Sequence, residues 1–298
     1  EYETYGTVLG QSYAGQAQAQ AVIAQLASGA AVLGVSLSTA AGLLYLMIRW
    51  RKKGDGVSDE LVRQSPQPQR AGVLFKTIIV IAVPVCLGSL AVNFSGIIDL
   101  MTVTGRLAEV MQTAPQALLD CYGANIPEAE IINNSVHNYL YGAYSGKAVV
   151  IANLVPALTA GLAVSALPVV AESFAQGNRL RTQRSVQMVL RITTIVCIPA
   201  GLGISALAQE VCELFFGYNS EVAIGAPLLQ VLAIASIFIA LTAAINSLLQ
   251  AVGRVSLPVK LILIGSLVKL AMNYILVGIP QINIQAAPWS TLACYLLV

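Results

Sequence analysis

The sequence has 298 residues, of which 57% are hydrophobic and only 10% are charged, with a formal net charge of +2. A soluble domain carries about 25% charged residues because water must cover its surface. Too little polar material is present here for that purpose, so the composition excludes a soluble globular domain. The small net charge also argues against nucleic acid as a partner. We expect an all-α, polytopic transmembrane helical bundle.

The two ends of the chain are also informative. The chain opens at Glu1 in a polar segment without a signal-peptide pattern. It stops at Val298, inside an apolar run that is too short to cross a bilayer. We therefore expect truncation at both ends.

Long apolar runs mark the expected membrane spans, since a transmembrane helix needs roughly 20 predominantly apolar residues. The sequence contains six such runs and the beginning of a seventh. In chain order, the predicted helices cover residues 26–48, about 77–103, 148–171, 186–208, 222–250, 257–277 and 289–298.

Two connections are longer than the others. Residues 49–72 combine basic charge with Ser, Pro, Gln and Gly, which is typical of a flexible linker between helical bundles. Residues 104–142 are predicted to form a long outer loop. Within this loop we expect an interfacial helix over Arg106–Leu119, interrupted at Pro115, and open loop near Asn133.

The charges of the loops predict the orientation, because short cytoplasmic loops are enriched in Lys and Arg. Residues 49–72, 173–185 and 251–256 are basic, whereas residues 104–142 and 209–221 have more acidic than basic side chains. The basic loops alternate with the acidic ones along the chain. We therefore expect the basic loops in the cytoplasm and residues 104–142 outside.

Ionisable residues inside the spans are candidates for a functional cavity, because a charge at bilayer depth is costly. Lys269 lies about 18 Å along its predicted helix, too deep to reach the interface easily, and we expect it to face a cavity. Its partner would be an anionic part of the substrate or a carboxylate of another lobe. Asp99, late in the second span, is interpreted either as a cavity carboxylate or as an interfacial one.

Amide side chains extend this candidate substrate cavity. Asn246 and Gln250 are four residues apart and share a helix face, and Lys269 and Asn273 repeat the spacing on the next span. Such residues either make hydrogen bonds between helices or line a solvated cavity. Lys147, at the outer end of the third span, is positioned to meet an anionic group that enters from outside.

The sequence shows no catalytic signature, and we expect no catalytic residue, no cofactor and no bound metal. The single histidine, His137, has no partner cluster, and the five cysteines lack metal-ligand spacing. No phosphate-binding loop of the ATP-driven type is present. The chain is therefore not expected to be an enzyme.

Several local motifs, from about residue 26 to the end, resemble one family of membrane proteins. The motifs are Tyr141-Gly142-x-Tyr144, Leu167-Pro168, Glu172 with Gly177-Asn178, Leu249-Gln250-Ala251-x-Gly253-Arg254 with Pro258, and Lys269 with Asn273-Tyr274. Together they resemble the polysaccharide biosynthesis and stage V sporulation protein B-like branch of the multidrug/oligosaccharidyl-lipid/polysaccharide (MOP) exporter superfamily, to which the lipid II flippase is related.

The resemblance implies a two-lobe fold like that of multidrug and toxin extrusion (MATE) transporters. On that frame, residues 1–48 end an N-terminal lobe that is otherwise missing and must be supplied as a partner, residues 49–72 link the lobes, and residues 73–298 form the C-terminal lobe. The implied protein is a multi-pass flippase of the bacterial cytoplasmic (plasma) membrane. Its partners would be membrane lipids and a lipid-linked oligosaccharide or other cell-wall precursor, from peptidoglycan or polysaccharide biosynthesis.

Two alternatives follow from the same residues. A cation-coupled multidrug exporter of the superfamily would need a coupling cation and a carboxylate buried at mid-depth, and no such carboxylate is expected here. A membrane enzyme acting on prenyl-linked sugars would need an acidic cluster at a membrane face, which the sequence lacks.

Overall fold

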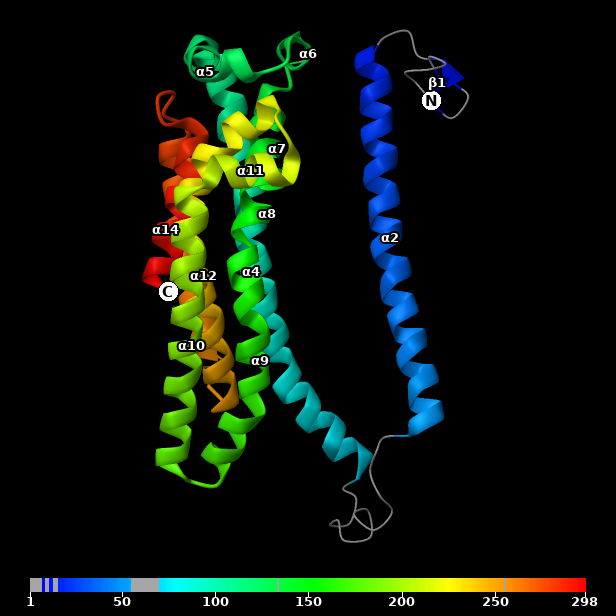
Figure 1. Cartoon of the computed structure of the whole chain (residues 1–298), viewed down its shortest axis with the longest axis vertical. Coiled ribbons are helices and arrows are strands. Elements are labelled where there is room, and N and C mark those ends of the chain that lie inside the picture. The colour runs from blue at the N-terminus through cyan, green and yellow to red at the C-terminus, as the bar shows by residue number, and fades with distance from the viewer. Residues whose placement is uncertain (1–6, 9–10, 13–15, 55–69, 133, 255) are drawn as a thin grey trace. The chain divides into compact units, whose positions relative to one another are not determined.

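The computed structural model describes residues 7–8, 11–12, 16–54, 70–132, 134–254 and 256–298. These residues divide into two compact units, Glu1–Leu74 and Phe75–Val298. Residues 55–69 of the predicted linker lie outside the described part. Apart from one hairpin of two-residue strands, the described chain is helical (Figure 1), which confirms the predicted all-α class.

The first unit contains the hairpin and one long helix. Strands β1 (Thr7–Val8) and β2 (Gln11–Ser12) pair antiparallel. Helix α2 (Gln16–Lys53) follows and includes a candidate membrane span at Gln25–Lys52. Its large apolar side chains are exposed on all sides within the unit, which is typical of a helix that lipid or other helices surround.

The second unit is a bundle of long helices with a cap of short ones at one end (Figure 1). Three of the long helices are candidate membrane spans, and a fourth candidate span covers Ser256–Val277. The long helices are α4 (Ala71–Thr113, which begins at the end of the first unit), α9 (Leu154–Ala175), α10 (Arg179–Ala206), α12 (Ser220–Ala251), α13 (Ser256–Met272) and the shorter α14 (Ala286–Leu297).

Short elements connect these helices at the capped end. Between α4 and α9 lie α5 (Pro115–Tyr122), η1 (Gly123–Asn125), α6 (Glu128–Ile132), α7 (Val136–Ala143), the π-helical segment η2 (Tyr144–Ala148) and α8 (Val149–Ala152). The others are α11 (Ala208–Phe216), the π-helical segment η3 (Asn273–Val277) and η4 (Asn283–Gln285).

The predicted outer loop of residues 104–142 is corrected by this arrangement. Helix α4 continues to Thr113, so residues 106–113 extend a long helix instead of forming a separate interfacial one. The break does fall at Pro115, which begins α5, because proline fits the first turn of a helix but not its interior. Most of the remaining segment is helical as well, because its apolar side chains, Leu118 and Leu140 among them, are buried against the bundle.

The capped end is held together by buried polar contacts. The Tyr122 hydroxyl donates a hydrogen bond to Asn283 Oδ1 at 2.8 Å, and Asn283 Nδ2 donates to the Pro280 carbonyl at 3.0 Å. Burial raises the pKa of Tyr122, so its phenol stays protonated and can act as the donor. These contacts join α5 to the connection that follows η3.

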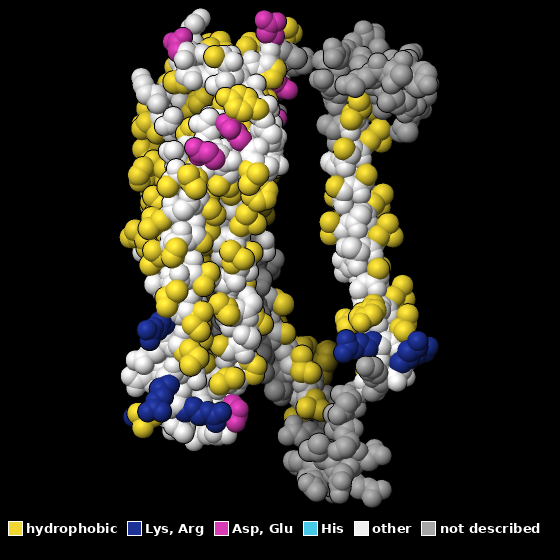
Figure 2. Space-filling model, in the orientation of Figure 1, with side chains coloured by type: hydrophobic (Ala, Val, Ile, Leu, Met, Phe, Trp, Pro, Cys, Tyr) yellow, Lys and Arg dark blue, Asp and Glu magenta, His cyan; other side chains and the backbone are white. Residues whose placement is uncertain are grey.

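Helix α12 forms the centre of the second unit. It packs against α9, α10 and α14, and fifteen of its residues are buried. The apolar side chains of the surrounding helices face outward, as Figure 2 shows for the middle of the unit. Apolar side chains on the outer surface are expected of a bundle that lipid covers.

The charges separate toward the two ends of this unit (Figure 2). The turn between α9 and α10 carries Arg179, Arg181 and Arg184, whereas the capped end carries most of the acidic side chains. Toward the capped end, Arg106 pairs with Glu109 and Lys147 with Glu221. The predicted orientation is consistent with this distribution.

Cysteine labelling tests the orientation. In a cysteine-free background, a cysteine at Asn134 should react with a membrane-impermeant maleimide added to intact cells, and one at Gln176 should not. Both positions are exposed, and they lie at opposite ends of the second unit. Reaction at Gln176 with protection at Asn134 would reverse the orientation. Permeabilised cells should label both positions and provide the control.

Close packing of α10 on α12 gives a stability prediction. A Cβ atom added at Gly201 would meet the Ile237 side chain and lie 2.8 Å from the Ala233 carbonyl oxygen. We expect Gly201→Ala to lower the free energy of unfolding by about 1–3 kcal/mol, the usual cost of overpacking. Gly203→Ala, two residues along the same helix, is the control, because nothing lies within 4 Å of its added Cβ. Equal thermal unfolding of the two variants would contradict this packing.

Candidate functional site

A buried ion pair joins α4 to α13 inside the second unit. The Lys269 ammonium lies 2.6 Å from Asp99 Oδ2, and the two residues are 3% and 7% exposed. The Asp99 carboxylate thus points into the bundle, as the cavity interpretation expects. In this structure the partner of Lys269 is Asp99, which belongs to the same compact unit.

Neutral polar side chains complete the coordination of this pair. Lys269 Nζ donates to Ser95 Oγ at 3.2 Å, and Asn273 Nδ2 donates to Asp99 Oδ1 at 2.8 Å and to Thr102 Oγ1 at 3.2 Å. Ser290 Oγ lies 2.5 Å from Asn273 Oδ1. Both charges therefore have several hydrogen-bond partners, which a buried ion pair requires if it is to be tolerated.

Two π-helical segments aim their first residues at the same carboxylate. Tyr144 begins η2 and its hydroxyl lies 3.5 Å from Asp99 Oδ2, while Asn273 begins η3 and contacts Asp99 Oδ1. A π-helical turn inserts a residue into a helix and re-aims the side chains around it, and such turns occur frequently at functional sites. Two of them meeting at one carboxylate indicate a functional centre.

A cavity of about 210 Å³ adjoins this centre. It is smaller than the 300–1,000 Å³ typical of a pocket for a drug-sized ligand, so it fits a small polar group such as a phosphate. Its polar lining includes Ser95, Asp99, Tyr144, Asn153, Lys269 and Thr291. The cavity thus presents one cation, one carboxylate and several neutral hydrogen-bonding groups.

The structure does not bring all the predicted cavity residues together. Lys269 lines the cavity, and Asn273 lies directly behind the ion pair. Asn246 and Gln250 are partly buried on α12, but the helix contributes Leu232 and Ile239 to the cavity instead. Asn246 follows Ile239 by seven residues, about 10 Å along the axis. Contact of Asn246 and Gln250 with a substrate therefore stays a prediction.

Lys147 occupies a different environment from the one its sequence position suggested. Its Nζ atom lies 3.1 Å from Glu221 Oε2 and 4.5 Å from the centre of the Phe216 ring. Its Cβ is also close to Gly225, where an added Cβ would lie 3.3 Å away. These contacts join η2 to the start of α12, so the lysine is engaged within the protein.

We therefore expect Lys147→Gln to leave transport largely intact while lowering stability by about 1 kcal/mol or less, because the ion pair is partly exposed. A charge swap, Lys147→Glu with Glu221→Lys, should recover most of the loss. Thermal unfolding and substrate transport of the purified variants measure the two effects. A transport loss of tenfold or more in Lys147→Gln, at unchanged stability, would return Lys147 to the substrate cavity.

The sequence analysis missed several residues of this centre. Ser95 and Thr102 lie four residues before and three after Asp99, so all three share one face of α4. That spacing was a readable signal of a polar stripe. Ser290 and Thr291 carried no comparable signal, because isolated hydroxyl residues are common in membrane helices.

A membrane-spanning helical bundle with a buried ion pair beside a polar cavity has the features of a transporter. Residues 143–275 match the MatE family model. No curated protein matches this chain. The family match covers α9, α10 and α12 and the Lys269 and Asn273 positions.

Two solved structures share the fold. One is a MOP superfamily transporter from Pyrococcus furiosus, described as having a binding pocket of reverse polarity that suggests a different function. Its TM-score is 0.55 at 14% sequence identity, and the match covers 77% of this chain and 45% of that one. The other is a multidrug resistance MATE family transporter of the MOP superfamily in an outward-facing conformation, with a TM-score of 0.54 at 14% identity, over 77% of this chain and 46% of that one.

These matches confirm the MOP transporter fold and support placement of the chain in that superfamily. The chain spans somewhat less than half the length of the two solved structures. The matches extend to the MOP superfamily and not to the particular branch that the sequence motifs suggest. They suggest a multi-pass membrane protein with the fold of MOP transporters.

Proposed function

We propose that this chain forms most of one lobe of an alternating-access transporter that flips a lipid-linked oligosaccharide, such as a peptidoglycan or polysaccharide precursor, across a bacterial plasma membrane. The observation that supports the proposal best is the buried Lys269–Asp99 pair beside a polar cavity. A lipid-linked precursor carries a phosphate group on its lipid, and a buried ammonium is a suitable partner for that group.

The ion pair provides a resting state for the cation. An ammonium group buried without a partner tends to lose its proton, because burial disfavours the charged form. Asp99 is the counter-ion of Lys269 while the site is empty, and a substrate phosphate can then take the place of the carboxylate. Asp99 would be released toward the neutral donors around it, above all Asn273 and Tyr144.

The rest of the lining suits a sugar phosphate better than a flat apolar compound. Hydroxyl groups of Tyr144 and Thr291 and the amide of Asn153 face the cavity beside the ion pair. Sugars are bound through such hydrogen-bonding groups, because each hydroxyl that leaves water needs a new partner. The remaining contacts to the oligosaccharide would come from the other lobe of the transporter.

A cation-coupled multidrug exporter is the second candidate, and one observation favours it. Asp99 is a carboxylate buried inside the bundle, and a carboxylate buried at mid-depth is what this alternative needs. One of the two similar structures is a multidrug resistance transporter. In this chain, however, Lys269 already neutralises Asp99, so a cationic drug or coupling ion would have to displace a covalently attached ammonium.

Transport assays separate the two candidates. The complete transporter, with both lobes, is reconstituted in liposomes and tested for flipping of fluorescent lipid II and for uptake of a cationic dye under a proton or sodium gradient. We expect lipid flipping that an excess of unlabelled lipid-linked sugar inhibits, and no dye transport. Dye transport without lipid flipping would establish the multidrug alternative instead.

A further inference from the structure

A second polar region lies at the opposite end of the bundle from the cap, where α9 turns into α10. Gly177 adopts a left-handed conformation with φ of +69°, and the Asn178 amide nitrogen donates to the Ser173 carbonyl at 3.1 Å. The Asn178 side chain then caps α10 by accepting a hydrogen bond from the Arg181 amide nitrogen at 3.1 Å. These bonds fix the backbone of the turn and thereby the directions of the side chains that follow it.

The turn has an excess of positive charge. Arg179, Arg181 and Arg184 occupy the first two turns of α10, where the helix dipole already contributes a partial positive charge. The only acidic group paired with them in the described part of the chain is Glu172, 3.8 Å from Arg181. The side chains of Arg179 and Arg184 have no hydrogen-bond or ion-pair partner among the described residues. The exposed side chains of Arg179 and Arg184 are therefore free to pair with an anionic group outside the chain.

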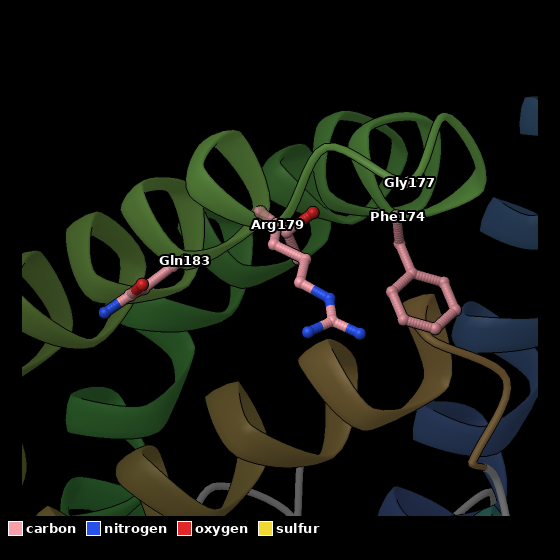
Figure 3. A pocket seen from close by; sticks show the side chains of 5 residues that line it. Phe174, Gly177, Arg179 and Gln183 are labelled. Atoms are coloured by element: carbon pink, nitrogen blue, oxygen red, sulfur yellow. The ribbon is translucent and has the colours of Figure 1, made fainter.

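The arginines are divided between two faces of α10. Arg181, Arg184, Ser185 and Met188 follow one another at helical spacing and line a pocket of about 440 Å³. Arg179, Thr182 and Gln183 lie on the other face and line a pocket of about 320 Å³ with Phe174. In Figure 3 the Arg179 and Phe174 side chains extend to the same side of the turn. The first pocket holds two arginines and is the more strongly basic.

The face with two arginines continues as an apolar stripe toward the middle of the bundle. Met188 and Ile195, which are 62% and 61% exposed, lie seven residues apart, with Ile192 between them on the same face. Arg191 is also exposed there, and its long side chain can extend back toward the basic pocket. Charged groups at the end of a helix followed by exposed apolar groups match the shape of a phospholipid, with its anionic head and its acyl chain.

We propose that this face of α10 binds an anionic phospholipid, with the phosphate held by Arg181 and Arg184 and an acyl chain packed along Met188, Ile192 and Ile195. The inference is independent of the proposed transport substrate. A free phosphate would use the two arginines but not the apolar stripe, and an acidic peptide would not extend into the lipid-facing part of the helix. The combination of both features indicates a lipid.

Lipid binding to the purified complete transporter tests this site. Native mass spectrometry counts phosphatidylglycerol and phosphatidylcholine molecules retained at increasing lipid concentration. We expect the wild-type protein to prefer phosphatidylglycerol, and each of Arg181→Gln and Arg184→Gln to weaken that binding about fivefold, the contribution usual for one basic residue near an anionic surface. Arg254→Gln, in another basic loop, is the control and should change nothing.

Two further measurements test the lipid assignment. Met188→Asn should weaken binding of long-chain phosphatidylglycerol but not of the dihexanoyl form, because only the long chain reaches the apolar stripe. Inorganic phosphate at millimolar concentration should not displace the lipid; if it does so fully, the site binds free anions.

Equal binding of the two lipids, or a loss seen only in Arg179→Gln, would overturn the assignment to this face. Unchanged elution and thermal unfolding confirm that each variant is folded.

Discussion

Asp99→Asn is expected to lower the free energy of unfolding by about 3–5 kcal/mol, the usual cost of removing one partner from a buried ion pair. Lys269 would then be buried without a counter-ion, and it would either keep an uncompensated charge or lose its proton at a comparable cost. The double variant Asp99→Asn, Lys269→Gln removes both charges and keeps amide groups of similar size. It should recover most of the lost stability.

Thermal unfolding of the complete transporter in detergent measures this cycle. Asp99→Asn, Lys269→Gln and the double variant are compared with the wild-type protein under the same conditions. We expect a coupling of at least about 2 kcal/mol between the two positions, since residues in direct contact are not additive. Additive losses in the double variant would mean that the ion pair does not form in the native protein.

Transport by the same double variant should fall at least tenfold, although its stability is largely restored. The variant keeps the packing around the cavity but has no cation to hold a substrate phosphate, so the structural and functional roles of Lys269 are separated. Lys269→Gln alone cannot separate them, because it leaves Asp99 buried without its partner. Flipping of fluorescent lipid II in liposomes is the measurement, normalised to the amount of reconstituted protein.

Lys260→Gln is the matched control for this experiment. Lys260 lies on the same helix, α13, but near its start, and it is exposed. We expect normal transport in that variant. Normal transport in the double variant as well would show that Lys269 serves only the structure of the lobe, and the proposed exchange of Asp99 for a substrate phosphate would then be abandoned.

The long helices were predictable from the sequence because their apolar runs reflect a general requirement for crossing a bilayer. The predicted bounds of α12, 222–250, agree closely with Ser220–Ala251, whereas α4 extends ten residues beyond its predicted end, to Thr113. The larger error concerned residues 104–142. There the end of α4 is followed by short helices with one apolar face, which a search for long apolar runs does not detect.

The candidate site was only partly predictable. Lys269 and Asn273 were identified because a charge and an amide at helical spacing are unusual at that depth. Asp99 was identified as well, but its direction was left open, since the depth of one residue does not determine which way its helix is rotated. Lys147 was assigned to the cavity by its place at the end of a span, whereas its contacts with Glu221 and Phe216 depend on α11 and α12.

The sequence by itself determined that this protein is a helical membrane bundle, and it predicted the end at which each loop lies, because composition, run length and loop charge act locally along the chain. Only the tertiary structure decided that Asp99 meets Lys269. These residues are 170 positions apart, and their contact depends on how α4 and α13 rotate and pack. The π-helical turns that bring Tyr144 and Asn273 to the same carboxylate are likewise stabilised by the surrounding helices, since no local sequence preference favours that geometry.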